Sequence, residues 1–169
     1  ICGKGSDNLP HTYIYKNTQA GFILVNDKLK PLYGHVAVAD YDSDRDIDIL
    51  LTGSDRYGNT NAILYRNDNN FKFTEIYANL YKFSYGNKPK FGDFNDDGRL
   101  DLICGKVYRN DGNNLFTEIL FEEGYDARNS IHWSDIDNDG KLELIGTGDW
   151  GTAVYKYNGV DSFLVNIEI

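Results

Sequence analysis

Short apolar and aromatic runs recur along this chain, separated by turns that are rich in Asn, Asp and Gly. The clearest runs are 47–53, 100–105 and 142–146, each followed by a run that carries a tyrosine, at 63–67, 107–110 and 154–157. Runs of this length, rich in β-branched and aromatic residues, are typical of strands. Because no segment sustains the period of about 3.6 residues that marks an amphipathic helix, the pattern predicts an all-β protein.

The order of these runs repeats along the chain. A further run, Phe-Thr-Glu-Ile, follows at 73–76 and 116–119, with a looser version at 163–167. The N-terminal residues fit the same order, with 1–4 as a second strand, 12–17 as a third and 21–25 as a fourth. Four short strands for each repeat of 53 or 42 residues fit the blade of a β-propeller.

We therefore expect a β-propeller of four-stranded antiparallel blades, in a single domain that covers 1–169. Its predicted parts are a partial blade at 1–33 and full blades at 34–86, 87–128 and 129–169. Propellers close with about 4–8 blades, and about three and a half blades would leave sheet edges exposed at both ends. The chain is therefore predicted to be part of a larger propeller of about six to eight blades. The same longer chain or another subunit would supply the remaining blades.

Two further expectations concern a hairpin turn in the predicted propeller and the origin of the chain. Asn110-Asp111-Gly112 predicts the tight turn of a hairpin in the blade at 87–128. The chain contains no methionine, which predicts an internal segment or a processed product of a longer protein.

Each full blade is predicted to carry a nine-residue acidic loop after its first strand. In all three loops, oxygen side chains stand at the first, third, fifth and ninth positions, and a backbone carbonyl is available at the seventh. Oxygen ligands at this density are what a hard cation such as Ca²⁺ requires. The predicted ligands, which include the carbonyls of Arg99 and Lys141 and the neighbouring carboxylate of Asp46, are Asp40, Asp42, Asp44, Asp46, Asp48, Asp93, Asn95, Asp97, Arg99, Asp101, Asp135, Asp137, Asp139, Lys141 and Glu143.

The three loops predict about three Ca²⁺ sites with a mainly structural role. Gly98 and Gly140 at the sixth position allow the left-handed turn that wraps an ion. Arg45 stands there in the first loop and should cost about 1–2 kcal/mol, which its additional carboxylates offset. Ordinary acidic turns are the alternative, but like-charged clusters repel one another without a cation. An EF-hand needs a longer loop between two helices, which these strand-flanked loops do not provide.

The loops also account for much of the charge. They hold 13 of the 26 acidic residues in a chain whose formal net charge is −9. This acidity argues against nucleic acid and anionic membranes as partners, and no apolar run is long enough for a membrane-spanning helix. Cys2 and Cys104 occupy equivalent places in two repeats, so we expect two small buried residues and no disulfide.

On these loops and strands, the sequence resembles the FG-GAP and VCBS family of calcium-binding propeller repeats, the kind found in integrin α-subunit heads. The resemblance rests on the acidic loops, on Phe91-Gly92 before the second loop, and on the Tyr-Arg-Asn-Asp and Phe-Thr-Glu-Ile segments. It implies Ca²⁺ in the hairpin loop that joins the first two strands of a blade. It also implies a secreted or cell-surface protein engaged in adhesion or carbohydrate contact. Arg45, the terminal Glu143 and the missing "GAP" half depart from the family pattern.

The leading hypothesis is a non-enzymatic calcium-binding propeller module for adhesion, protein–protein assembly or glycan contact, with its ligand at the propeller face. The alternative is a propeller portion of a carbohydrate-active or lipid-hydrolysing enzyme. The sequence contains no Gly-x-Ser-x-Gly elbow and no phosphate-binding loop. The glycine-rich segment 146–151 resembles a dinucleotide-binding fingerprint, but it leads into a predicted strand where that motif requires a helix.

The remaining candidates are isolated side chains. His11, His35 and His132 fall in separate predicted blades without further ligands at metal-binding spacing. Trp133 is expected in a blade core. Trp150 lies in a predicted turn and is the better candidate for contact with a sugar or a partner.

Overall fold

The computed structural model describes residues 1–81, 88–121, 130–148, 151–160 and 162–168, and the regular elements in them are all β-strands. The strands are β1 (Cys2–Lys4), β2 (Pro10–Thr12), β3 (Ile14–Thr18), β4 (Gly21–Asn26), β5 (Tyr33–Ala39), β6 (Asp48–Ser54), β7 (Thr60–Asn67), β8 (Phe73–Ile76), β9 (Lys90–Gly92), β10 (Asp101–Ile103), β11 (Val107–Gly112), β12 (Leu115–Phe121), β13 (Ser130–Ser134), β14 (Glu143–Gly148), β15 (Gly151–Tyr157) and β16 (Ser162–Glu168). The prediction of an all-β protein is confirmed. Among the described residues, none forms a helix of the length and apolarity needed to cross a membrane.

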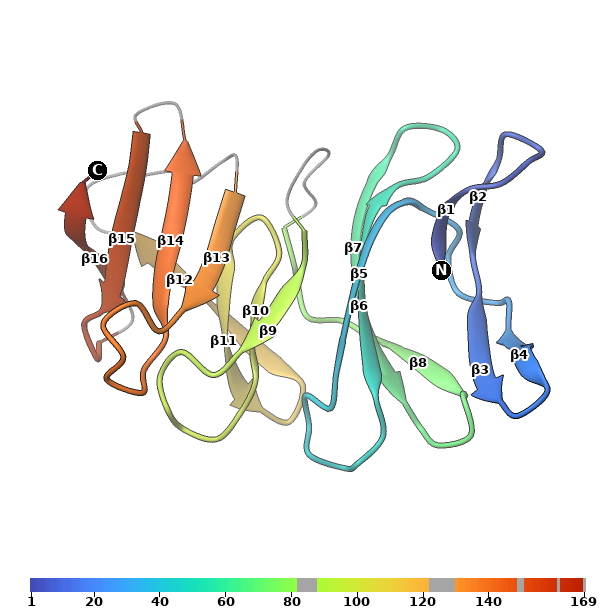
Figure 1. Ribbon diagram of the computed structural model, residues 1–169, viewed down its shortest axis with the longest axis horizontal. Helices are drawn as coiled ribbons and strands as arrows, with labels where there is room; N and C mark the ends of the chain where they lie inside the picture. The colour runs from blue at the N-terminus through green and yellow to red at the C-terminus, as the bar shows by residue number, and fades with distance from the viewer. Residues whose placement is uncertain (82–87, 122–129, 149–150, 161, 169) are drawn as a thin grey trace.

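Strand pairing follows the order of the chain. β1 pairs with β2 and β3 with β4 in two small antiparallel sheets, and β5 to β8 form a four-stranded antiparallel sheet. The last eight strands form one sheet, in which two antiparallel groups, β9–β12 and β13–β16, meet where β12 and β16 run parallel. The groups stand side by side from the N-terminus to the C-terminus (Figure 1). The division of the chain into blades at the boundaries given above stays a prediction.

The predicted strand 12–17 is divided between β2 and β3. Tyr13 lies at the division, where its N–H donates to the carbonyl of Ile1 at 2.8 Å and its carbonyl accepts from the Ile1 ammonium at 2.8 Å. From Ile14 onward the backbone pairs with β4 instead. One run therefore contributes to two sheets because its pairing partner changes at Tyr13.

The hairpin turn between β11 and β12 lies later than Asn110-Asp111-Gly112. Gly112 pairs with Leu115, and the two residues between them, Asn113 and Asn114, have φ values of 51° and 64°. Two consecutive left-handed residues are what a two-residue hairpin turn of type I′ requires, and asparagine tolerates this conformation. The predicted turn residues instead form the end of β11, where the register shifts between Asn110 and Gly112.

Apolar side chains fill the spaces between neighbouring groups of strands. On β6, Leu50 packs toward β10 and β11, whereas Ile49 and Leu51 pack toward β1 and the 27–32 segment. A strand covered on both faces reads as a continuous apolar run, which explains the pattern of 49–51. A further cluster around Ile103 and Leu144 joins the last two groups.

Glycine at position 92 makes room for the indole of Trp133. A Cβ at this position would lie 2.5 Å from Trp133 Cδ1, which is too close for van der Waals contact. Trp133 stacks on Phe94 with a centroid distance of 5.6 Å and is partly buried against the last core cluster. Its predicted place in the core agrees with this packing, whereas Trp150 lies outside the described residues.

The two cysteines are free thiols, as the sequence predicts. Cys104 is buried in the cluster that joins β6 and β10. Cys2 is only half-buried, contrary to expectation, because it lies on the N-terminal strand and contacts the Gly34 carbonyl at 3.2 Å from Sγ. Burial raises the pKa of the Cys104 thiol to about 12.

Candidate metal centres

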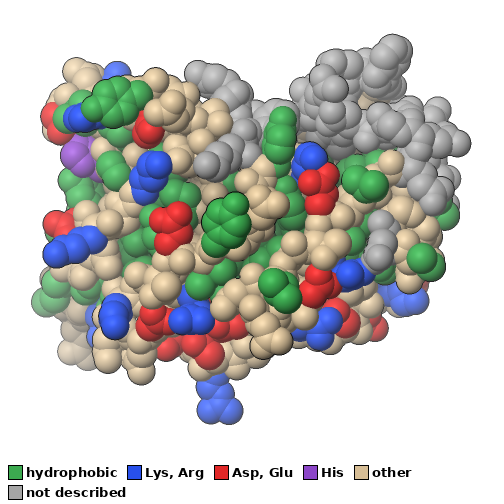
Figure 2. Space-filling view, turned by 180° about the vertical axis from the view of Figure 1, so that it is seen from behind, with side chains coloured by type: hydrophobic (Ala, Val, Ile, Leu, Met, Phe, Trp, Pro, Cys, Tyr) green, Lys and Arg blue, Asp and Glu red, His purple; other side chains and the backbone are tan. Residues whose placement is uncertain are grey.

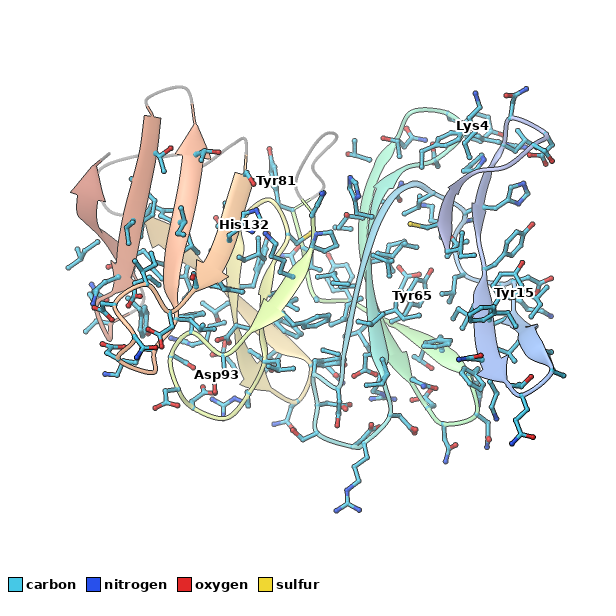
Figure 3. All side chains as sticks on the ribbon, viewed as in Figure 1. Lys4, Tyr15, Tyr65, Tyr81, Asp93 and His132 are labelled. Carbon is cyan, nitrogen blue, oxygen red and sulfur yellow. The ribbon has the colours of Figure 1, made fainter. Side chains whose placement is uncertain are left out.

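The three acidic loops connect β5 to β6, β9 to β10 and β13 to β14. All three lie at the same end of the strands, where Asp93 is labelled in Figure 3. From behind, Asp and Glu side chains gather along this lower end, interspersed with Lys and Arg (Figure 2). The loops therefore share a position within successive antiparallel groups of strands.

The first aspartate closes each loop by accepting two backbone N–H groups. Asp93 accepts from the N–H groups of Asp97 at 3.1 Å and Gly98 at 2.8 Å. The same bonds, from the fifth and sixth positions to the first, occur in the other loops at 2.9 to 3.0 Å. A short-range bond from a side chain to its own turn favours this fold locally. The loop shape is thus built into the spacing of the aspartates.

The backbone turns into the left-handed region at the sixth position of every loop. Gly98 and Gly140 have φ values of 82° and 89°, and Arg45 has 77°. Glycine adopts this conformation freely, whereas an L side chain is strained there. Arg45 is therefore a strained residue in the first loop.

Replacing Arg45 with glycine is expected to stabilise the protein by about 0.5–1 kcal/mol, because the strain relieved exceeds the added entropy of the unfolded chain. Chemical denaturation would measure the change. Arg45→Ala is the matched control, since it removes the same charge and keeps the left-handed β-carbon. Equal stabilisation by both variants would attribute the effect to charge and contradict this account.

The ninth residue of each loop is a buried carboxylate. Asp48 and Asp101 are 0% exposed and Glu143 is buried as well. Asp101 accepts from the N–H groups of Phe94 at 3.1 Å and Asn110 at 2.8 Å, and so joins its loop to β11. Asp48 does the same with Tyr41 and Asn67. These bonds fasten each of the first two loops to the hairpin that follows it.

Burial leaves Asp48 and Asp101 short of compensating charge. Desolvation raises the pKa of Asp48 to about 6 and that of Asp101 to about 7, although backbone N–H donors act in the opposite direction. Desolvation and the nearby Asp44 also raise the pKa of Asp42. A bound cation would favour the charged forms. The electrostatics of the loops therefore fit a metal ion.

Two of the loops bring three acidic side chains together. Oxygen atoms of Asp40, Asp42 and Asp48 lie within 4.8 Å of one another, and those of Asp135, Asp137 and Glu143 do the same. Both clusters could hold a metal ion, and oxygen ligands of this type suit Ca²⁺. The other predicted carboxylates stand outside these clusters: Asp44 accepts from Asp46 N–H at 2.8 Å, and Asp139 accepts from Lys141 N–H at 2.9 Å.

The second loop has one carboxylate fewer among its predicted ligands because its third position is Asn95. The Asn95 amide donates to Asp97 Oδ2 at 2.9 Å, and the Arg99 guanidinium pairs with the same carboxylate. Arg99 Nε also donates to the Asn110 carbonyl at 2.7 Å. The side chain of Arg99 therefore links the loop to β11. This contact is separate from the predicted role of the Arg99 backbone carbonyl as a metal ligand.

Asn110 belongs to the candidate site, although the sequence predicts for it only a place in a hairpin turn. Its amide donates to the Leu100 carbonyl at 3.1 Å and to the Tyr41 carbonyl of the first loop at 3.0 Å. Asn67 repeats the first of these bonds with the Ile47 carbonyl at 3.2 Å. The repeated Tyr-Arg-Asn-Asp segments contain this signal, because the asparagine follows the tyrosine at a constant spacing.

A lysine of β15 reaches the carboxylates of the third loop. Lys156 Nζ pairs with Asp137 and lies 3.5 Å from Glu143 Oε1. In the preceding groups the equivalent arginines pair instead with an aspartate two residues later, as Arg66 does with Asp68 at 2.8 Å. Asn158 replaces that aspartate in the third group. Lys156 therefore turns toward the acidic loop.

Replacing Lys156 with glutamine is expected to strengthen Ca²⁺ binding at the third loop about tenfold, because a competing cation leaves two carboxylates. Calcium titration by calorimetry would measure the change. Lys141→Gln, which removes an exposed charge from the same loop, is the matched control. An equal increase in Ca²⁺ affinity in both variants would mean that Lys156 affects binding only through the overall electrostatic potential, and would contradict a direct role of its contacts with the two carboxylates.

One comparison with known protein families matches the part of the chain that holds the first two acidic loops. Residues 40–104, which span the first two loops, match the model of the FG-GAP-like repeat. This segment is an FG-GAP-like repeat, as its resemblance to that family predicts. No curated protein matches the chain.

A solved structure has a similar fold. It is the structure of an Agrocybe aegerita lectin, and it concerns the structural basis of the specific recognition of non-reducing terminal N-acetylglucosamine by that lectin. The TM-score is 0.54 with 19% sequence identity, over 98% of this chain and 52% of the lectin chain. The chain therefore spans about half the length of the lectin, and at this identity the similarity concerns the fold alone.

Proposed function

We propose that this chain is a segment of a calcium-stabilised β-propeller that contacts glycans at an extracellular surface and has no catalytic role. The observation that carries the proposal is the repeated acidic loop, closed by the same hydrogen bonds at the same end of successive groups of strands. The FG-GAP-like repeat and the fold similarity to a lectin support it.

Calcium would act here as a structural ion. The side chains that would hold it are those of the first, third and ninth positions, with Asp97 added in the second loop: Asp40, Asp42, Asp48, Asp93, Asn95, Asp97, Asp101, Asp135, Asp137 and Glu143. The ion would supply positive charge beside the buried ninth carboxylate, which is bonded to the loop and to the next strand. Because only the folded loop presents these ligands together, binding stabilises the folded state by mass action.

Exposed apolar residues on β3 and β4 support a larger propeller. Phe22 and Leu24 of β4 are exposed on one face of the hairpin, as are Tyr15, which pairs with Leu24, and Ile1 beside them. Contiguous apolar surface of this kind marks an interaction site. A further blade, from the same longer chain or from another subunit, would cover this face.

An extracellular location follows from the proposed metal requirement. Extracellular calcium modules bind at about 10⁻⁴–10⁻³ M, a range that exposed loops of this kind suit. Glycan contact is preferred to protein adhesion because the fold is shared with a lectin. Adhesion through a protein partner is the outcome to expect if glycans do not bind.

A glycan array probed in millimolar Ca²⁺ and in excess chelator tests the proposal. We expect binding to a restricted set of glycans in Ca²⁺ and a loss of binding where the chelator loosens the fold. A protein that stays folded and binds no glycan would contradict the glycan part of the proposal. Turnover of a polysaccharide in the same assay would favour the enzymatic alternative.

A further inference from the structure

A cavity of about 490 Å³ opens between β2, the 27–31 segment and the turn between β6 and β7. Its volume lies within the range of about 300–1,000 Å³ that is usual for small-ligand sites. The turns that form it lie at the upper end of the strands in Figure 1, opposite the acidic loops. A ligand there would be remote from the candidate metal centres.

One wall of the cavity is a fixed array of polar side chains. His11 Nε2 lies 2.9 Å from Asp7 Oδ2, and His11 Nδ1 lies 2.7 Å from the Tyr13 hydroxyl. Because a carboxylate only accepts hydrogen bonds, Nε2 donates to Asp7, and in the neutral imidazole Nδ1 then accepts from the Tyr13 hydroxyl. The His11 and Tyr13 rings also stack with a centroid distance of 5.1 Å. These bonds hold the wall in one arrangement before a ligand arrives.

The opposite wall is the turn between β6 and β7. Asp55 Oδ1 accepts from the N–H groups of Tyr57 at 2.9 Å and Asn59 at 3.0 Å, which fixes the turn. The guanidinium of Arg56 lies 4.5 Å from the centroid of the Tyr57 ring. The Tyr57 side chain nevertheless remains 72% exposed. The turn therefore presents an aromatic ring, held in place, to the cavity.

The charges around the cavity balance. Asp27 and Asp55 are matched by Lys30 and Arg56, and Lys30 Nζ donates to Asn61 Oδ1 at 2.6 Å. A balanced lining does not favour an anion or a cation over a neutral ligand. A pyranose ring is neutral, with an apolar face suited to an aromatic ring and hydroxyls suited to carboxylate and guanidinium groups.

We propose that this cavity binds the terminal sugar of a glycan. The sugar ring packs on Tyr57, its hydroxyls donate to Asp27, and Arg56 and Lys30 donate to its oxygens. The inference rests on the proposed glycan contact and adds the site at which it occurs. It also separates the two ends of the molecule, with sugar at the β6–β7 turn and Ca²⁺ at the acidic loops.

Calorimetric titration of the 169-residue chain with N-acetylglucosamine, and with any sugar found on a glycan array, tests this site. Tyr57→Ala and Asp27→Ala are each expected to weaken binding about tenfold. Tyr77→Ala is the matched control, because this tyrosine is 90% exposed and does not line the cavity. The melting temperature and the Ca²⁺ affinity should stay unchanged in all three variants.

The outcomes separate the two proposals. If the unaltered chain binds a sugar and Tyr57→Ala and Asp27→Ala bind it equally well, the site is wrong while the proposed function stands. If the unaltered, folded chain binds no sugar, both the site and the proposed glycan contact fail. Weaker binding by Tyr77→Ala alone would place the sugar on a different surface.

Discussion

Replacing Asp101 with asparagine is expected to lower the free energy of unfolding in millimolar Ca²⁺ by about 2–4 kcal/mol. The buried carboxylate accepts from the N–H groups of both Phe94 and Asn110. An asparagine amide has only one oxygen, so its NH₂ group would face one of these donors and leave it unsatisfied. The variant also removes the ninth ligand of the second loop. Urea unfolding at constant Ca²⁺ would measure the loss.

Asp96→Asn provides the matched control for this prediction. Asp96 is an exposed residue of the same loop, so the substitution removes an equal charge, and asparagine tolerates its left-handed φ of 58°. We expect a change within about 0.5 kcal/mol. In excess chelator, the Asp101→Asn loss should shrink toward the part caused by the lost hydrogen bond. A loss that is identical with and without Ca²⁺ would show that Asp101 has no part in metal binding.

The calcium-free protein is expected to lose stability as the pH rises from about 5 to 8, by an amount on the order of 3 kcal/mol. Burial raises the folded-state pKa of Asp48 to about 6 and that of Asp101 to about 7. Because the folded state holds these protons more tightly than the unfolded state, the stabilising effect is complete below the ordinary aspartate pKa of about 3.9 and is lost as the pH passes the raised values.

Calcium should abolish this dependence. The ion favours the charged carboxylates and displaces their protons, so stability in saturating Ca²⁺ should stay nearly constant over the same pH interval. The gap between the unfolding free energies in Ca²⁺ and in chelator is therefore expected to widen as the pH increases. Urea unfolding at about pH 5 and 8 would measure the gap. A gap that stays constant with pH would exclude the buried aspartates as the groups that link protons to metal.

The all-β class and the closure of the acidic loops were accessible from the sequence because their causes are local. Apolar runs such as 49–51 reflect strands covered on both faces. The aspartate spacing encodes hydrogen bonds from a side chain to a backbone only a few residues away, such as Asp93 to Gly98. Such short-range features can be read without knowledge of the neighbours.

The features that the sequence analysis missed depend on long-range contacts. The Asn110 amide bonds to the carbonyl of Tyr41, 69 residues earlier in the chain. The direction in which Lys156 points depends on Asn158, which replaces an aspartate found in the other groups. The cavity at Tyr57 is assembled from three separate segments. The bond from Asn110 to Tyr41 and the cavity depend on which groups of strands become neighbours, whereas the direction of Lys156 depends on contacts within its own group.

The central claim is that Ca²⁺ bound by the acidic loops stabilises this fold. Thermal unfolding of the same sample in millimolar Ca²⁺ and in excess chelator tests it most directly. Two occupied sites at about 10 times their dissociation constants would contribute about 3 kcal/mol, which raises the melting temperature by roughly 6–11 °C. Superimposable unfolding curves under the two conditions would contradict the account.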